Sequence, residues 1–187
     1  MPNTARRVGV AIIAAGLLLG MPLQVQAKAG SRGVGTVSAF TNFTEPPGKI
    51  TLSPNCPGPE CGMRGEYRTQ LNGPAIYGYE ISNLYTFPDP GGSGAVFYHG
   101  TAVFYVDKSP CGKGTFEEII SNGTADYSRI GPNTRAVPIK NDWTIVPGSG
   151  TGQLRGIEGS GTDEADIALD GSGEGRHYGT LTCHLRG

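Results

Sequence analysis

The sequence predicts an all-β protein, a closed antiparallel barrel of about eight strands. After the amino-terminal region, no segment of about 11 or more residues carries apolar side chains at helical spacing. Short runs rich in Val, Ile, Tyr, Phe and Thr are instead separated by turns rich in Gly and Pro. Because no helices are expected to cover a parallel sheet, the strands should pair antiparallel, and glycines within them suit the curvature of a small barrel.

The first 27 residues are interpreted as a secretory signal peptide. Arg6 and Arg7 precede an uncharged apolar run over residues 8–21, and small residues up to Ala27 suit cleavage by a signal peptidase. The run is shorter than the roughly 18 to 20 residues that a membrane-spanning helix needs. The expected mature protein is therefore a single domain over residues 28–187, secreted or periplasmic, with no membrane insertion.

The charge of the chain argues against two classes of partner. The formal net charge is −1, and loss of the two arginines with the signal peptide takes it to −3. A mildly acidic, mixed surface disfavours nucleic acids and anionic membranes as partners.

The expected strands follow one another through the mature chain, and the loop over residues 46–62, which is rich in proline, interrupts them. Asn122 and Gly123 favour a type I′ turn and thus a hairpin between the strands on either side. The strands are predicted over residues 33–42, 64–71, 75–82, 95–106, 115–121, 125–130, 139–146, 153–162 and 176–185.

All four cysteines lie in the mature chain, and an even number in an exported protein suggests two disulfides. Cys56 and Cys61 enclose a rigid turn, which favours pairing them with each other and Cys111 with Cys183. The other two pairings remain open from the sequence alone. A zinc site is disfavoured because there are no paired Cys-x-x-Cys units.

The glycine-rich stretch WTIVPGSGTGQLRGIEGSGT, residues 143–162, raises the question of a phosphate-binding loop. The sequence has no Gly-Lys-Ser/Thr, its spacing is not that of a dinucleotide-binding loop, and the glycines that follow would not hold a helix. The favoured interpretation is a hairpin: residues 147–152 turn the chain, and Gly156, Gly159 and Gly161 let the next strand coil.

The same stretch resembles a motif of an uncharacterised family of small bacterial barrels, in which a strand led by tryptophan enters a Pro-Gly-Ser-Gly-Thr-Gly turn. More distantly, residues 149–152 resemble the Gly-Gly-Thr-Gly turn of allene oxide cyclases and plant dirigent proteins. SPCGKGTFEEIISNGTADYS, residues 109–128, is similar to the family's glycine hairpin and following strand. The resemblance covers about residues 95–162 and implies an allene oxide cyclase-like barrel, but it matches no catalytic carboxylate and does not define the chemistry.

Glu118 is the candidate catalytic residue. Along residues 115–120 one of two adjacent glutamates must share a face with apolar side chains, and we expect this to be Glu118. A carboxyl group inside the barrel would have a raised pKa and could act as an acid. A solvated position at the rim is the alternative. Glu66 and Glu80 are expected to face water.

Four aromatic residues are candidates for binding a ligand in the barrel, with ordinary core packing as the alternative. They are Tyr67, Tyr77, Tyr79 and Trp143. His99, His177 and His184 lie on expected strands but form no recognisable catalytic grouping. No calcium-loop spacing occurs either, so neither a metal nor a cofactor is expected.

Three functions fit this prediction. The first is an exported barrel that binds a small apolar or aromatic ligand without catalysis. The second is a cofactor-independent isomerase or cyclase acting in the same cavity, in which Glu118 or a tyrosine hydroxyl stabilises developing charge. The third is a secreted or envelope interaction protein with a filled barrel. A cavity lined by a desolvated carboxyl group would favour the second function over the first.

Overall fold

The computed structural model describes residues 25–26, 34–45, 49–51, 63–73, 75–88, 95–129, 136–168 and 172–184. These residues form one antiparallel sheet, so the predicted all-β fold is confirmed. The predicted signal peptide, apart from Val25 and Gln26, lies outside the described residues, as do Cys56 and Cys61. The strands are β1 (Val25–Gln26), β2 (Val34–Glu45), β3 (Lys49–Thr51), β4 (Met63–Asn72), β5 (Tyr77–Pro88), β6 (Ala95–Lys108), β7 (Gly114–Asp126), β8 (Ala136–Ile145), β9 (Glu158–Ala168) and β10 (Gly173–His184).

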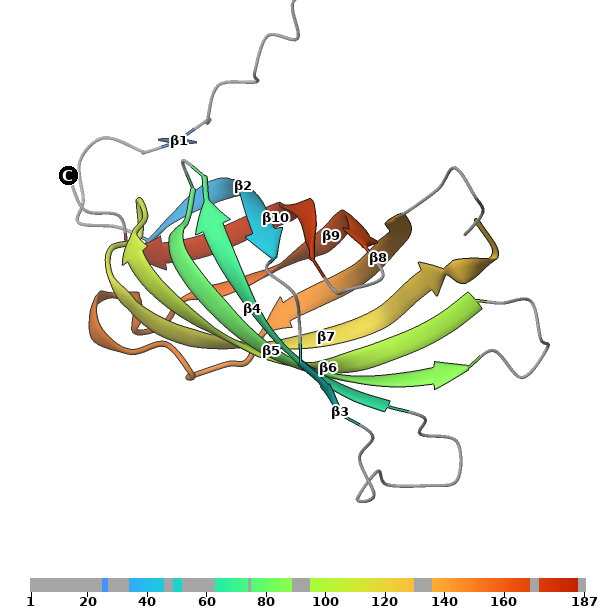
Figure 1. Cartoon of the computed structure of the whole chain (residues 1–187). Coiled ribbons are helices and arrows are strands. Elements are labelled where there is room, and N and C mark those ends of the chain that lie inside the picture. Colours follow the sequence, from blue (N-terminus) through green and yellow to red (C-terminus); the bar gives the residue numbers. More distant parts are fainter. Residues whose placement is uncertain are drawn as a thin grey trace, which may run out of the picture.

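The sheet is strongly curled and forms a half-barrel (Figure 1). Its strands lie in the order β1-β2-β10-β9-β8-β7-β6-β5-β4-β3. The predicted full closure is corrected by this structure, because β2 and β4 pair only through Phe43 with Leu71 and Thr44 with Gln70. Long strands twist strongly relative to their neighbours, so β2 and β4 diverge on either side of the point where they meet.

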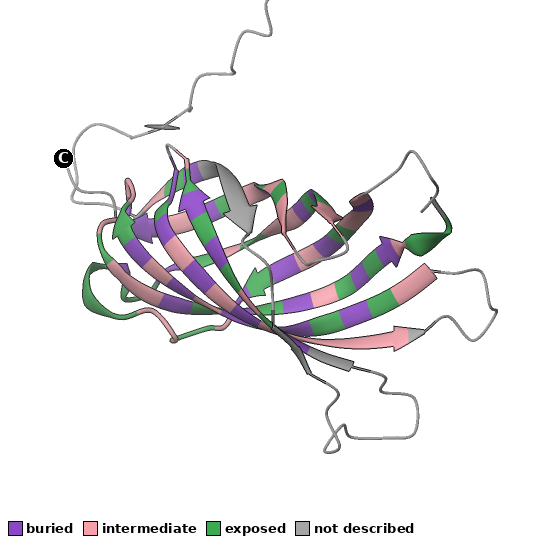
Figure 2. Ribbon diagram, in the orientation of Figure 1, coloured by how far each residue is buried: buried purple, intermediate pink, exposed green. Residues whose placement is uncertain are grey.

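Buried and exposed residues alternate along the strands of the curled sheet (Figure 2). On β6, every second residue from Tyr98 to Val106 is buried, as expected for a strand with one face in the core. Phe104 and Phe116 stack in this core with ring centroids 4.7 Å apart. One end of the interior is therefore apolar, and polar side chains fill its middle.

The predicted hairpin at Asn122 and Gly123 is wrong, because β7 continues through both residues as a bulged strand. The register with β6 shifts between Tyr98 and Gly100, and the register with β8 shifts between Ser121 and Thr124. Asn122 has a φ of 52°, so the left-handed conformation that suits a type I′ turn serves a bulge instead. Pairing on both sides of the bulge outweighs the local preference for a turn.

The bulge makes room for the ring of Tyr98 in the interior. A Cβ atom on Gly123 would lie 2.4 Å from Cδ2 of Tyr98. We therefore expect Gly123→Ala to displace this ring and to lower the free energy of unfolding by about 1–3 kcal/mol, the usual range for overpacking. Urea unfolding measures the loss. Thr124→Ala, at the exposed neighbouring residue, should change the stability little, and an equal loss in both variants would contradict the steric explanation.

The glycine-rich stretch connects β8 to β9, and these strands form the predicted hairpin. The connection contains a short 3₁₀ helix, η2 (Gly152–Leu154), and is hydrogen-bonded to the beginning of β7. At Gly161, a Cβ atom would lie 1.8 Å from the carbonyl oxygen of Tyr178 and 2.6 Å from the Trp143 ring. The glycine thus allows both the close approach of β10 and the burial of the indole.

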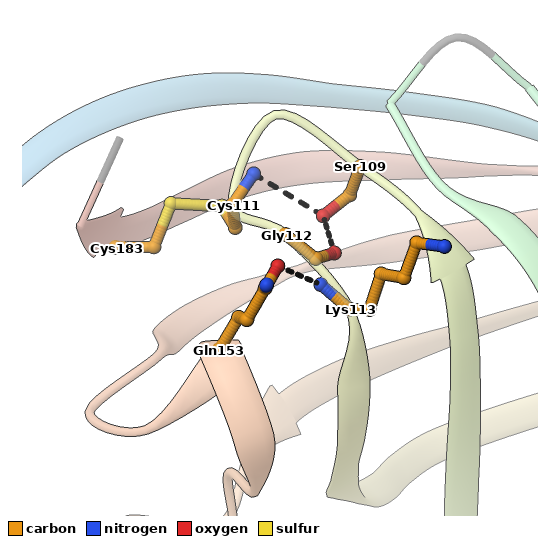
Figure 3. Close-up of a disulfide and its surroundings, with 6 residues drawn as sticks. All are labelled: Ser109, Cys111, Gly112, Lys113, Gln153 and Cys183. Atoms are coloured by element: carbon orange, nitrogen blue, oxygen red, sulfur yellow. Dashed lines mark hydrogen bonds between the residues drawn. A yellow bond between two sulfur atoms is a disulfide. The ribbon is translucent and has the colours of Figure 1, made fainter. Parts of the chain in front are cut away.

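A disulfide between Cys111 and Cys183 fastens the turn between β6 and β7 to β10 (Figure 3). This pairing is one of the two predicted from the sequence. The turn is ordered by Ser109, whose hydroxyl donates to the carbonyl of Gly112 at 2.8 Å and accepts from the amide of Cys111 at 3.2 Å. Both cysteines are at most 2% exposed, so the disulfide is part of the apolar end of the core.

Candidate acid–base site

Polar side chains from seven successive strands, β4 to β10, meet in the interior of the half-barrel. Each of them is at most 7% exposed. Most of them surround a cavity of about 40 Å³, which has room for about one or two water molecules. The polar residues are Thr69, Glu80, Ser82, Tyr98, Glu118, Asn141, Asp163 and His177.

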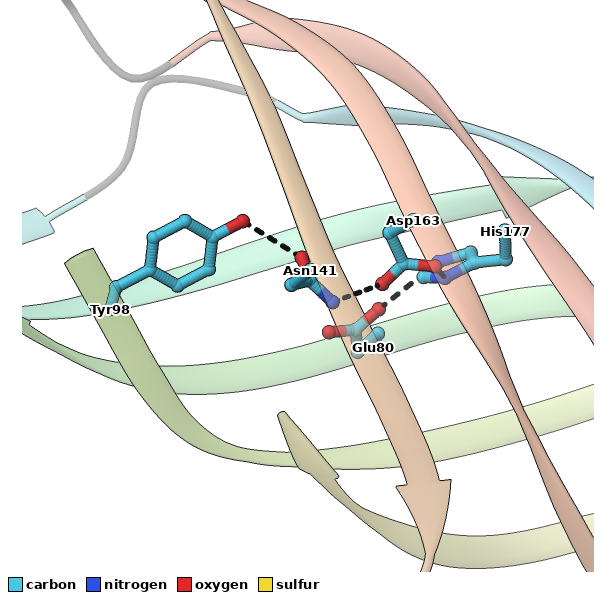
Figure 4. A network of polar contacts seen from close by, with 5 residues as sticks. All are labelled: Glu80, Tyr98, Asn141, Asp163 and His177. Carbon is cyan, nitrogen blue, oxygen red and sulfur yellow. Dashed lines mark hydrogen bonds and ion pairs between the residues drawn. The ribbon is translucent and has the colours of Figure 1, made fainter. Parts of the chain in front are cut away.

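Five of these residues form a chain of polar contacts (Figure 4). The hydroxyl of Tyr98 donates to Oδ1 of Asn141 at 2.8 Å, and Nδ2 of Asn141 donates to Oδ2 of Asp163 at 3.0 Å. The other oxygen of Asp163 bonds Nδ1 of His177. On the far side of the ring, Nε2 of His177 lies 3.5 Å from Oε2 of Glu80.

The register of the sheet explains why these side chains meet. Asn141 on β8 lies directly across from Asp163 on β9, and Asp163 lies directly across from His177 on β10. Residues directly opposite each other in an antiparallel sheet have side chains on the same face and within contact distance. The three strands therefore present a polar row to the interior at one level.

His177 lies between the carboxyl groups of Asp163 and Glu80, which favour its protonated form. Burial by itself lowers the pKa of His177, but the charge and hydrogen bond of Asp163, together with those of Glu80, raise that pKa well above its ordinary value. The edge of the imidazole also contacts Phe104, with centroids 5.6 Å apart. The ring is thus held in place by contacts with Asp163, Glu80 and Phe104.

Glu118 is the second acid of the interior and differs from Glu80 in its surroundings. Burial raises the pKa of Glu118 well above 4.5, the charge of His177 partly offsets this effect, and the charges of Asp163 and Glu80 add to it. Its carboxyl group therefore keeps its proton to a higher pH than an exposed glutamate does.

The raised pKa values of His177 and Glu118 predict that stability falls as the pH rises. Glu118 loses its proton above about pH 4.5 in the unfolded chain, and His177 above about 6.5, whereas the folded protein retains both protons. The contribution of each retained proton to the free energy of unfolding is complete below the pKa of the group in the unfolded chain. It is lost as the pH rises through the higher pKa of that group in the folded protein. By linkage, the free energy of unfolding falls by about 1.4 kcal/mol per pH unit for each retained proton. Urea unfolding between pH 5 and 9 measures this slope through the fluorescence of Trp143, the only tryptophan.

Two adjacent glutamates provide a matched comparison for the pH dependence. Glu118→Gln removes one titrating group and should flatten the slope by one proton, whereas Glu117→Gln, on the exposed face of the same strand, should leave it unchanged. If both variants kept the slope of the wild type, Glu118 would not retain its proton in the folded state.

The residues predicted from the sequence lie in three different surroundings. Glu118 lies in the interior at 3% exposure, and Trp143 lies there at 2% with no hydrogen-bond partner for Nε1 among the described residues. Tyr67 is half-buried on the interior face of β4, beside Gly65. Tyr77 and Tyr79 lie on the outer face of β5, and Tyr77 is 48% exposed.

The expectation that Glu80 faces water is wrong, and so is the expected inward face of β5. Glu80 is 5% exposed and faces His177, whereas Tyr79 is half-buried on the outside. There its ring stacks on Tyr105 at 4.6 Å, and the guanidinium of Arg68 lies 4.4 Å from its centroid. Contacts on the outer face thus cover Tyr79, and His177, as a charge partner, permits the burial of Glu80.

Glu80, Asn141 and Asp163 are not among the residues that the sequence predicts for the site, and His177 is only one of three histidines on predicted strands. The structure pairs Asn141 with Asp163 across β8 and β9, whereas extending the hairpin from the predicted turn at 147–152 would place Asn141 opposite Glu158. The register that brings these two residues together is therefore not predicted by the sequence. The other contacts depend on curvature and on pairing between distant strands.

No family model matches this chain, and no curated protein sequence matches it significantly. The resemblance to the small bacterial barrels and allene oxide cyclases therefore stays a prediction. In the part of the chain that the structure describes, no helix is long and apolar enough to cross a membrane. Within the same residues, no group of three or more His, Cys, Asp or Glu side chains is arranged to hold a metal ion.

Proposed function

We propose that this protein is a cofactor-independent acid–base enzyme, an isomerase or cyclase, that acts in the interior of the half-barrel. The observation that carries the proposal is the pair of buried glutamates around one imidazolium. Glu80 lies 3.5 Å from His177, whereas burial raises the pKa of Glu118. A carboxyl group next to a histidine, close to a second acid that holds its proton to a higher pH, is an arrangement suited to general acid–base catalysis.

In this mechanism, Glu80 removes a proton from a carbon atom next to a substrate carbonyl, and Glu118 donates a proton to the carbonyl oxygen. The C–H bond breaks as its proton passes to Glu80, and an O–H bond forms with the proton of Glu118, which gives an enol. Glu80 then returns its proton to another carbon atom of the conjugated enol while the enol O–H returns its proton to Glu118, so that the carbonyl is restored and both glutamates are regenerated. Asp163 and His177 act as positioning residues, because the imidazolium stays next to Glu80 and stabilises its charge. Enclosure by the apolar core confines the substrate and excludes water.

The size of the cavity sets a condition on this function. Its volume of about 40 Å³ is far below the roughly 300 Å³ or more of ordinary ligand pockets. A substrate therefore has to displace side chains, and the half-buried Leu84 and Ile139 in the cavity wall are the least enclosed. The same small volume favours the second candidate function, a secreted or envelope interaction protein with a filled interior.

We also propose that the chain is exported. The apolar run over residues 8–21 and the Cys111–Cys183 disulfide support this proposal, since disulfides form and persist mainly in oxidising compartments. Mass spectrometry of the purified protein tests it: the expected mass begins after Ala27, and a mass that retains the first 27 residues would contradict export.

Solvent exchange tests the enzymatic proposal without knowledge of the substrate. A small-molecule extract of the source cells is incubated in D₂O with the wild-type protein, Glu80→Gln or Glu66→Gln, and each compound is weighed by mass spectrometry. We expect the wild type and the exposed-site control Glu66→Gln to introduce deuterium into a compound, and Glu80→Gln to do so at least about 100-fold more slowly.

One result would decide against the proposed enzyme. If the wild type introduced no deuterium and converted no compound, acid–base catalysis would be excluded. Native mass spectrometry of the same protein then separates the other functions. An extra mass that is lost on denaturation indicates a non-catalytic binding protein, and the bare mature mass supports the filled interior.

A further inference from the structure

The outer face of β4 to β7, which lie side by side in the sheet, is apolar although it faces outward (Figure 1). Three of the four large apolar side chains that are exposed in the described part of the chain lie here: Tyr77 at 48%, Phe97 at 45% and Ile119 at 50%. Between them lie four half-buried apolar side chains, Tyr79, Ile81, Val103 and Tyr105. The solvated face of an antiparallel sheet is normally polar, and a contiguous exposed apolar patch marks an interaction site.

The register of the sheet gives this face a row of side chains with one basic and one acidic end. Arg68 on β4 lies opposite Ile81 on β5. Ile81 lies opposite Val103 on β6, and Val103 lies opposite Glu117 on β7. Arg68 and Glu117 are both exposed, and neither forms an ion pair with a described residue. The row therefore runs from a cation through two aliphatic side chains to an anion.

A second copy of the chain matches this row at both ends. A two-fold axis parallel to the strands and passing between Ile81 and Val103 lays β4 of each copy over β7 of the other. Arg68 of each copy then faces Glu117 of the other, and the aliphatic centres of the two rows meet. Sheets that pack face to face with nearly aligned strands are a common arrangement in proteins.

The neighbouring row of the face has the composition of a protein interface. Tyr79 and Tyr105 stack there with ring centroids 4.6 Å apart, and the guanidinium of Arg68 lies 4.4 Å from the Tyr79 centroid. Tyrosine and arginine are enriched in protein interfaces and among the residues that dominate their binding energy. Because these three side chains already contact one another, they lose less conformational freedom when a partner binds.

The face has the area that a specific interface needs. Along β5 from Tyr77 to Phe87 and across the four strands, it measures roughly 33 Å by 19 Å at about 3.3 Å per residue and about 4.8 Å per strand. Two copies would together bury about 1,200 Å², which is the lower end of the range for stable protein–protein interfaces. An interface of this size is compatible with a dissociation constant in the micromolar range.

We propose that the outer face of β4 to β7 is a homodimer interface, in which two copies of this chain pack about a two-fold axis parallel to the strands and form two ion pairs between Arg68 and Glu117. The apolar side chains of the face supply most of the buried area. The ion pairs fix the relative position of the two copies, because opposite charges select one register and like charges disfavour the others.

Sedimentation velocity of the purified protein at concentrations up to about 200 μM tests the proposal, since a dimer with a micromolar dissociation constant is mostly assembled there. We expect the wild type to dimerise, and Arg68→Glu or Glu117→Arg to weaken the dimer at least about tenfold, because like charges then face each other. An equimolar mixture of the two variants should regain the affinity of the wild type. In the mixed dimer each introduced side chain faces an opposite charge on the other copy.

Arg155→Glu and Glu158→Arg are the matched controls, because they make the same charge changes at exposed residues outside the face and should dimerise as the wild type does. A wild type that stays monomeric would overturn the proposal and leave the face to a different partner. A dimer that both reversals leave intact, or a mixture that does not recover, would also overturn it. If a variant does not fold, salt decides: the dimer of the wild type should weaken as the ionic strength rises, and a dimer insensitive to salt would contradict the ion pairs.

Discussion

Replacing Asp163 with asparagine should lower the free energy of unfolding by about 3 kcal/mol, the largest effect expected of any single substitution in the buried cluster. Asp163 bonds both His177 and Asn141 and is 6% exposed. Asparagine retains the size of the side chain but removes the charge that holds the imidazolium. Removing one partner of a buried ion pair leaves the other uncompensated or forces it to lose its proton, and either outcome destabilises the fold.

Urea unfolding at pH 6, followed by the fluorescence of Trp143, measures this effect. Asp166→Asn is the matched control, because Asp166 lies on the exposed face of the same strand, and its unfolding free energy should change by less than about 0.5 kcal/mol. A double-mutant cycle with His177→Gln separates the pair from its surroundings. Additive losses in the double variant would show that Asp163 and His177 do not interact and would remove the positioning role assigned to them.

The architecture could be predicted from the sequence because its signals are local. Alternating side chains and glycine- or proline-rich turns predict most of the long strands, and the glycines at 147–161 predict the hairpin between β8 and β9. The incomplete closure of the barrel could not be predicted in this way. The extent of pairing between β2 and β4 depends on the accumulated twist of all the strands between them.

The site could be predicted only in part, because alternation assumes an apolar interior. This assumption holds on β7, where Glu118 shares its face with Phe116 and Ile120, and on β8, where Trp143 is buried. It fails on β5, because Glu80 has a charge partner on β10, a strand distant in the sequence. Asn122 and Gly123 likewise favour a turn locally, while pairing with the neighbouring strands makes them a bulge.

Loss of the Cys111–Cys183 disulfide should lower the free energy of unfolding by about 4 kcal/mol. The disulfide joins residues 72 positions apart, and in the chain-entropy model a cross-link of this span restricts the unfolded chain by about that amount. The variant Cys111→Ser/Cys183→Ser measures the loss by urea unfolding under oxidising conditions. Both serine hydroxyls would also be buried, because the two cysteines are at most 2% exposed.

Cys56→Ser/Cys61→Ser is the control for this measurement. A disulfide between these two cysteines, as predicted from the sequence, would close a much shorter loop, so its loss should destabilise the protein less. Treating the wild type with a reductant should reproduce the larger loss only after unfolding, since the buried Cys111–Cys183 bond is inaccessible to a thiol in the folded state. Rapid reduction without unfolding would show that this end of the half-barrel opens. The apolar end of the core would then give access to the interior.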